Sequence, residues 1–171
     1  MPDLRRFAIL PVLLLAVALL IGCGGEDRGP QTKEGFILDA DGVCESFAGE
    51  FEEAGAASPG TAKEVADANK VLADVYGRFS DVMSKVRLPE SGPARTQAKA
   101  YVDSVRASEP LLARLRTAAD GFLAAATGSD RQALTVAGNE LRSALDAFRA
   151  NRARSDTLAV QYGLNLCGNL D

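Results

Sequence analysis

The sequence contains no histidine and no tryptophan in its 171 residues. Without imidazole, the chain lacks the usual general base of enzymes and the commonest metal ligand, which excludes Ser-His-Asp, Cys-His and His-Glu-x-x-His chemistry. Acidic residues outnumber basic ones by 23 to 19, giving a formal net charge of -4. That balance argues against the basic surface that nucleic-acid phosphates require. We therefore expect no enzyme activity, no cofactor, no metal site and no nucleic-acid partner.

The amino-terminal segment carries an export pattern. Arg5 and Arg6 precede an apolar run of 15 residues, Phe7 to Ile21. A positive start followed by a short apolar core is typical of a secretion signal. A helix that spans a membrane needs roughly 20 apolar residues, so a retained transmembrane anchor is the weaker interpretation. We expect residues 1–22 to be a signal peptide.

The apolar run ends in Leu20-Ile21-Gly22-Cys23, which resembles the lipobox of bacterial lipoproteins. In that family the cysteine thiol receives a diacylglyceryl group, and a dedicated signal peptidase then cleaves the chain before it. The resemblance implies that Cys23 is lipidated and held at the membrane by two or three acyl chains, which suffice for stable anchoring. The alternative is an ordinary secretion signal. Residues 23–31 are rich in glycine and polar side chains, and we expect a flexible tether there.

Clusters of proline, glycine and serine divide residues 32–171 into four segments of one domain. Each segment is rich in helix-forming residues, has apolar residues every three or four positions, and lacks the alternation of a strand. The expected helices cover about 33–56, 61–86, 94–126 and 129–162. Four long helices with short connections predict an all-α fold, an antiparallel up-down-up-down four-helix bundle.

Three local signals refine these helices. Thr61 and Ser129, each followed three residues later by Glu or Gln, predict capping boxes at the second and fourth helices. The apolar periodicity of the third helix is unbroken across Pro110, so we expect one kinked helix over 94–126. A proline costs about 3 kcal/mol in a helix interior and can equally split the helix.

Two cysteines remain once Cys23 is assigned to the lipid. An even pair in an exported protein favours a disulfide under oxidising conditions. In an up-down-up-down bundle the first and last helices are adjacent and antiparallel, so the start of the first lies beside the end of the last. We therefore expect a bond between Cys44 and Cys167. The alternative is two free thiols.

Two stretches, Thr32 to Cys44 and Tyr162 to Cys167, resemble the ends of a group of small uncharacterised lipoproteins of high-GC Gram-positive bacteria. Those proteins begin with lysine, an aromatic-Ile pair and Ala-Asp-x-aliphatic-Cys, and they end with Gly-aliphatic and a second cysteine. Gly42 departs from this pattern, and we expect a weaker helix there. The resemblance implies a helical fold and an envelope location but no reaction.

Charged residues offer few candidate sites. The first helix holds seven carboxylates against Lys33, a net charge of -6, and we expect a solvated or internally paired face. Asp39 and Asp41 are similar to part of a calcium loop, but the spacing is one residue too short, and we expect solvated acids. Arg152 continues the apolar face of the last helix, where a buried arginine would need a carboxylate partner. It is our candidate ligand-binding residue.

These observations predict a non-enzymatic interaction or scaffold domain, anchored by lipid on the extracytoplasmic face of the cell membrane. The expected partners are the membrane, through the anchor, and an envelope protein. The alternative is a lipoprotein that binds a small apolar ligand or lipid between its helices. This alternative is suggested by three glycines inside the expected helices, because a missing side chain leaves room for a ligand. The same glycines, Gly77, Gly121 and Gly138, equally permit close packing of the helices.

Overall fold

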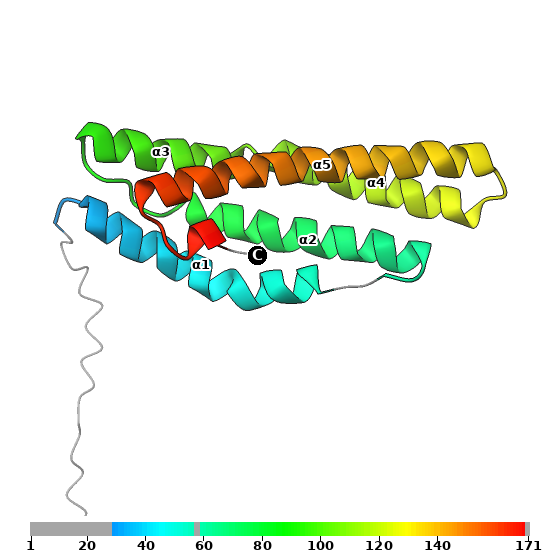
Figure 1. Cartoon of the computed structure of the whole chain (residues 1–171), viewed down its shortest axis with the longest axis horizontal. Coiled ribbons are helices and arrows are strands. Elements are labelled where there is room, and N and C mark those ends of the chain that lie inside the picture. The colour runs from blue at the N-terminus through cyan, green and yellow to red at the C-terminus, as the bar shows by residue number, and fades with distance from the viewer. Residues whose placement is uncertain (1–28, 57–58, 170–171) are drawn as a thin grey trace, which may run out of the picture.

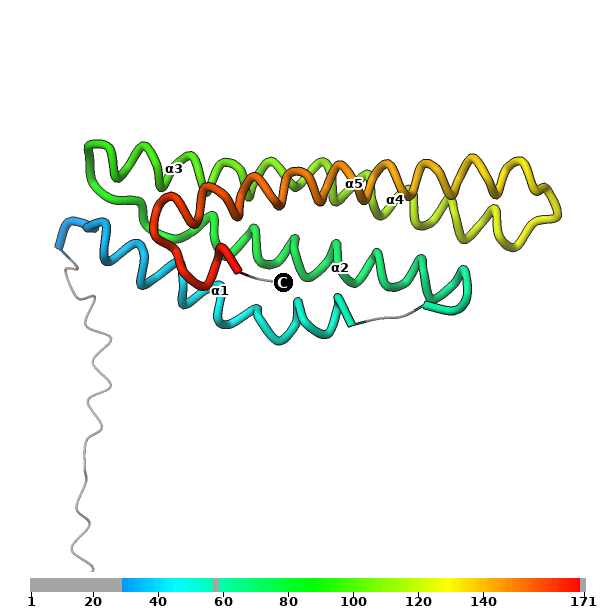
Figure 2. The backbone as a smooth tube through the Cα atoms, viewed as in Figure 1, coloured from blue at the N-terminus to red at the C-terminus, as the bar shows by residue number. Residues whose placement is uncertain are grey.

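The computed structural model describes residues 29–56 and 59–169, and α-helices carry most of them (Figure 1). The elements are α1 (Lys33–Gly55), α2 (Ala62–Met83), α3 (Gly92–Arg106), α4 (Glu109–Thr127), α5 (Arg131–Tyr162) and a short 3-10 turn, η1 (Cys167–Asn169). No strand occurs in these two ranges. Figure 2 shows the chain passing along the molecule four times in alternating directions, with α3 and α4 as the third pass. The predicted all-α bundle is confirmed.

The third pass is two helices rather than the continuous helix expected over 94–126. Ala107 and Ser108 separate α3 from α4, and both keep right-handed helical backbone angles. Pro110 is the second residue of α4, where it needs no N–H. The expectation was wrong because the apolar stripe continues in phase across the break, so the periodicity does not reveal it.

The helix ends follow capping rules with one correction. Thr61 and Glu64 form the predicted capping box at the start of α2. At the start of α5 the N-cap is Asp130, not Ser129, and its carboxylate accepts hydrogen bonds from the backbone N–H groups of the second and third following residues. Aspartate and serine are equally good caps, so the sequence leaves the choice between neighbours open. Helix α1 runs through Gly42 without interruption.

Aromatic rings from three helices fill the centre of the bundle. Neighbouring ring centroids lie 4.9 to 6.3 Å apart, within the range of edge-to-face attraction. The members of this cluster are Phe47, Phe51, Tyr76, Phe79 and Phe148. The apolar periodicity of the helices expected over 61–86 and 129–162 places Val82 and Leu134 on buried faces, but they are 40% and 36% exposed. Both residues lie close to an end of a helix.

The bundle changes in cross-section along its length, because α1 is shorter than α5 (Figure 1). At one end α1, α3, η1 and the end of α5 pack together. At the other end, past the last residue of α1, the helices of the described residues are α2, α4 and the start of α5. No helix in the described part of the chain is both long and apolar enough to cross a bilayer.

Candidate functional site

A disulfide joins Cys44 on α1 to Cys167 in η1, and the two Cα atoms lie 5.2 Å apart. The prediction of this pair is confirmed, and so is its topological reason, since the start of α1 lies beside the end of α5. The rings of Phe36 and Tyr162 meet there, with centroids 5.3 Å apart. The expected signal peptide, Cys23 and most of the expected tether fall outside the described residues.

The carboxylate of Asp41 holds the carboxyl-terminal turn against α1. It accepts hydrogen bonds of 3.1 to 3.3 Å from the backbone N–H groups of Asn165, Leu166 and Cys167. Asp39 accepts a bond from the side-chain amide of Gln31 instead. The expectation of a merely solvated acid is therefore wrong for Asp41, because the chain folds back onto it. Among the described residues, no group of three or more acidic or cysteine side chains could hold a metal ion.

Arg152 lies where α5 passes α1, and its side chain is 25% exposed. Its guanidinium carbon is 5.9 Å from the centroid of the Phe51 ring, and its Nε is 3.9 Å from the carboxylate of Asp156 one turn further along α5. The carboxylate that a buried arginine needs is thus supplied by the same helix. The geometry gives Arg152 a packing role between α5 and α1, and its ligand-binding role stays a prediction.

Two tyrosines in the interior are held in their neutral form. Burial raises the pKa of Tyr76 to about 12, with the Asp156 carboxylate adding to the effect and Arg152 opposing it. Burial also raises the pKa of Tyr101, whose hydroxyl lies 3.9 Å from the sulfur of Cys44. Phenols this hard to ionise are poorly suited to proton transfer near neutral pH.

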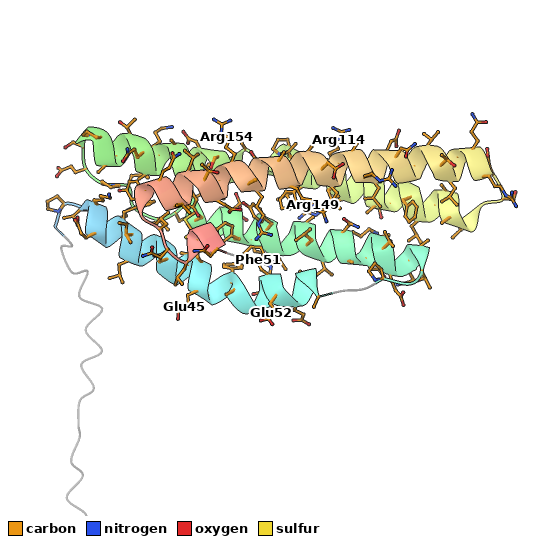
Figure 3. The ribbon with its side chains drawn as sticks, viewed as in Figure 1. Glu45, Phe51, Glu52, Arg114, Arg149 and Arg154 are labelled. Carbon is orange, nitrogen blue, oxygen red and sulfur yellow. A yellow bond between two sulfur atoms is a disulfide. The ribbon has the colours of Figure 1, made fainter. Side chains whose placement is uncertain are left out.

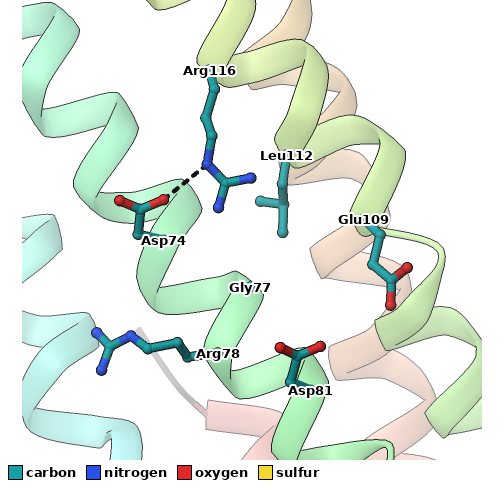
Figure 4. A pocket seen from close by; sticks show the side chains of 7 residues that line it. All are labelled: Asp74, Gly77, Arg78, Asp81, Glu109, Leu112 and Arg116. Atoms are coloured by element: carbon teal, nitrogen blue, oxygen red, sulfur yellow. Dashed lines mark hydrogen bonds and ion pairs between the residues drawn. The ribbon is translucent and has the colours of Figure 1, made fainter.

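A charged groove of about 560 Å³ lies between α2 and α4 (Figure 4). Arg116 donates to the carboxylate of Asp74 at 2.8 Å and to the backbone carbonyl of Ala73 at 2.9 Å. Gly77 gives the guanidinium room, because a Cβ at this position would lie 3.3 Å from Nη2 of Arg116. The second arginine of the groove, Arg78, pairs with Glu50 on α1. Both arginines therefore hold neighbouring helices against α2.

A second groove, which we name the α2–α5 groove, has a volume of about 450 Å³. It lies between α2 and α5, with α4 contributing its floor. Its apolar lining residues are Val65, Phe122, Leu141 and Leu145. Gly138 leaves the Phe122 ring open, because a Cβ there would lie 3.7 Å from that ring. The polar lining residues are Asn69, Arg142, Asp146 and Arg149.

The α2–α5 groove exists because α1 ends early. Phe51 of α1 lies beside Arg152 of α5. α1 ends four residues beyond Phe51, whereas α5 begins 21 residues before Arg152. At a rise of 1.5 Å per residue, about 25 Å of α5 extends past the end of α1. The α5 lining of the groove runs from Gly138 to Arg149, so most of it lies past the end of α1.

No protein-family model matches this chain, and neither a curated protein nor a solved structure matches it. The site must therefore be judged from its own residues. Sequence reasoning picked out Gly138 as a place with room but did not predict a groove. The signal that points to the groove is the difference in length between the first and last expected helices.

Proposed function

We propose that this protein is a non-enzymatic interaction domain of a bacterial cell envelope, anchored by lipid at Cys23 on the extracytoplasmic face of the membrane. The interaction role rests on the α2–α5 groove. An open groove lined by the partly exposed side chains of Val65, Phe122 and Leu145 over the buried Leu141, with a polar rim, has the composition of a protein contact site. Its charged rim would orient a partner, and its apolar floor would supply most of the binding free energy.

The anchor rests on the sequence Leu20-Ile21-Gly22-Cys23 and its resemblance to a lipobox. The test replaces Cys23 with serine in a bacterial host that processes lipoproteins. We expect the parent chain to incorporate labelled fatty acid and to partition into a detergent phase, and Cys23→Ser to do neither. A variant that replaces both Cys44 and Cys167 with alanine is the control and should keep its lipid. Unchanged partition of Cys23→Ser would refute the anchor.

The contact role of the groove is tested by cross-linking in intact cells. A photoreactive amino acid at position 142 should give a discrete protein adduct, whereas the same amino acid at position 154 should not. Arg154 lies at the edge of the molecule away from α1 (Figure 3). Filling the groove with Gly138→Leu should abolish the adduct from position 142. Equal adducts from both positions would reject the groove as the contact site.

A second candidate function is the binding of a small apolar molecule or lipid in the same groove. The apolar floor around Phe122 supports it, and a volume of about 450 Å³ lies within the usual range of ligand sites. Native mass spectrometry of the purified chain would then detect a bound lipid that disappears in Gly138→Leu. A mass that matches the processed chain and its covalent lipid alone would reject this candidate.

A further inference from the structure

We infer that the α2–α5 groove receives an acidic amphipathic helix of a partner protein, docked end to end with α1. This inference rests on the proposed function and adds the chemistry of the partner. It is carried by an internal example, because α1 is itself an acidic amphipathic helix lying on the same surface of the bundle.

α1 shows how this surface binds a helix. Its apolar face places Phe47 and Phe51 against the rings of Tyr76 and Phe79 on α2. It carries seven carboxylates, and one of them, Glu50, pairs with Arg78 of α2. On the other side, the guanidinium of Arg152 covers the Phe51 ring. An apolar stripe flanked by arginines is therefore already used to hold an acidic helix.

The same stripe continues beyond the end of α1. Leu141 and Leu145 extend the apolar face of α5, and Val65 extends that of α2. The α5 side of the groove runs from Gly138 to Arg149, about 17 Å, and accommodates roughly three turns of a helix. A helix in that position would form a four-helix cross-section with α2, α4 and α5, the helices that the described residues place around the groove.

The arginines continue along α5 as well. Arg142 and Arg149 are seven residues apart and so share one side of the helix, next to the groove. Figure 3 places Arg149 between α5 and α2, on the open face. Among the described residues, neither arginine forms an ion pair, although Asp146 lies between them in sequence. These two cations would meet carboxylates of an incoming helix as Arg78 meets Glu50.

The occupant differs from a second copy of this chain. The acidic helix of every copy is α1, whose apolar face is buried and whose Cys44 is bonded to Cys167. We therefore assign the occupant to another protein.

The test measures binding of two labelled 15-residue peptides to the full chain in nanodiscs of zwitterionic lipid, with empty nanodiscs subtracted. One peptide carries leucine and phenylalanine at helical spacing with glutamate elsewhere, and the other has lysine in place of every glutamate. We expect the acidic peptide to bind at least tenfold more tightly. Its affinity should fall as salt rises, because the rim arginines are exposed.

Variants then locate the site. Replacing both Arg142 and Arg149 with glutamate should lower the affinity for the acidic peptide by at least tenfold and raise the affinity for the lysine peptide. The matched control replaces Arg114 and Arg154 with glutamate, which changes net charge equally at the opposite edge (Figure 3) and should leave binding unchanged. Gly138→Leu should also abolish binding. It should remain folded, because leucine favours a helix more than glycine does, and circular dichroism verifies this.

The outcomes separate this inference from the proposed function. Equal binding of both peptides, or binding of neither, would overturn the acidic helix as occupant. A dimer that is lost in Gly138→Leu, detected by sedimentation, would also overturn it, since the occupant would then be a second copy. In each case the cross-link from position 142 in cells still decides whether the groove is a contact site.

Discussion

The side-chain amide of Asn151 on α5 donates a 3.0 Å hydrogen bond to the backbone carbonyl of Ser104 on α3. In a continuous helix this carbonyl would accept from the N–H of Ser108, but that N–H bonds to Val105 instead, at 3.1 Å. The tight turn before Pro110 thus frees a carbonyl, and α5 supplies its donor. Ser104 is only 7% exposed, so the bond replaces one that water would otherwise make.

We expect Asn151→Ala to lower the free energy of unfolding by about 1–2 kcal/mol, because the Ser104 carbonyl would be left buried without a partner. Urea denaturation measures the change. Asn69→Ala is the matched control, because the amide of Asn69 donates to a carbonyl of its own helix, that of Val65. The control substitution should lower the free energy of unfolding much less. Equal effects of the two substitutions would contradict the role assigned to Asn151.

The disulfide should contribute substantially to stability. Cys44 and Cys167 are 123 positions apart, and the chain-entropy model gives about 5 kcal/mol for a loop of this length. Reduction should therefore lower the melting temperature while the helical signal persists below the transition. Without reductant, peptide mapping should recover one cross-linked pair. A melting curve that reductant does not move would contradict this prediction.

Asp41 should contribute far more to the stability of the fold than Asp39. Asp41→Ala removes the acceptor of three backbone N–H groups and should cost about 1–2 kcal/mol, whereas Asp39→Ala loses one exposed contact to Gln31. Amide hydrogen exchange should accelerate at residues 165–167 in the first variant only. Unchanged exchange there in Asp41→Ala would show that the disulfide alone holds the turn.

The raised pKa values of the buried tyrosines predict how the stability of the protein changes at alkaline pH. Burial raises the pKa of Tyr76 to about 12 and also raises the pKa values of Tyr101 and Tyr162. The folded chain therefore binds these protons more tightly than the unfolded chain, in which a tyrosine ionises near pH 10. The stabilisation is complete below about pH 10 and is lost as the pH rises from there toward 12.

Absorbance at the phenolate band measures this directly, and the absence of tryptophan simplifies the signal. The folded protein should show little phenolate at a pH where the urea-unfolded protein is largely ionised. The urea midpoint should fall across the same interval. Tyrosines that titrate near pH 10 in the folded protein would contradict the prediction.

The sequence predicted what depends on local periodicity. The buried face of α1, with Phe36, Ala40, Cys44, Phe47 and Phe51, follows from spacings of three and four residues. The cysteine pair followed from topology, because alternating helices place the start of the first beside the end of the last. Both inferences required only helix geometry and chain order.

The remaining features depend on the offset of each helix relative to its neighbours along the bundle axis. The α2–α5 groove requires knowing that Phe51 lies beside Arg152, which fixes where α1 ends along α5. The role of Asp41 requires that residues after Gly163 turn back, which the left-handed angles of that glycine begin. Periodicity describes a face of each helix but says nothing of this offset.

The Cys44–Cys167 bond also determines how the domain responds to tension. A pull at Gly29 can peel away α1 only as far as Val43, since Cys44 is tied covalently to the other end of the fold. That first step releases at most about 50 Å of extended chain. The groove, whose lining residues run from Val65 to Arg149, lies wholly within the covalent loop. A partner held there would stay on an intact surface while the linker under load gives way first.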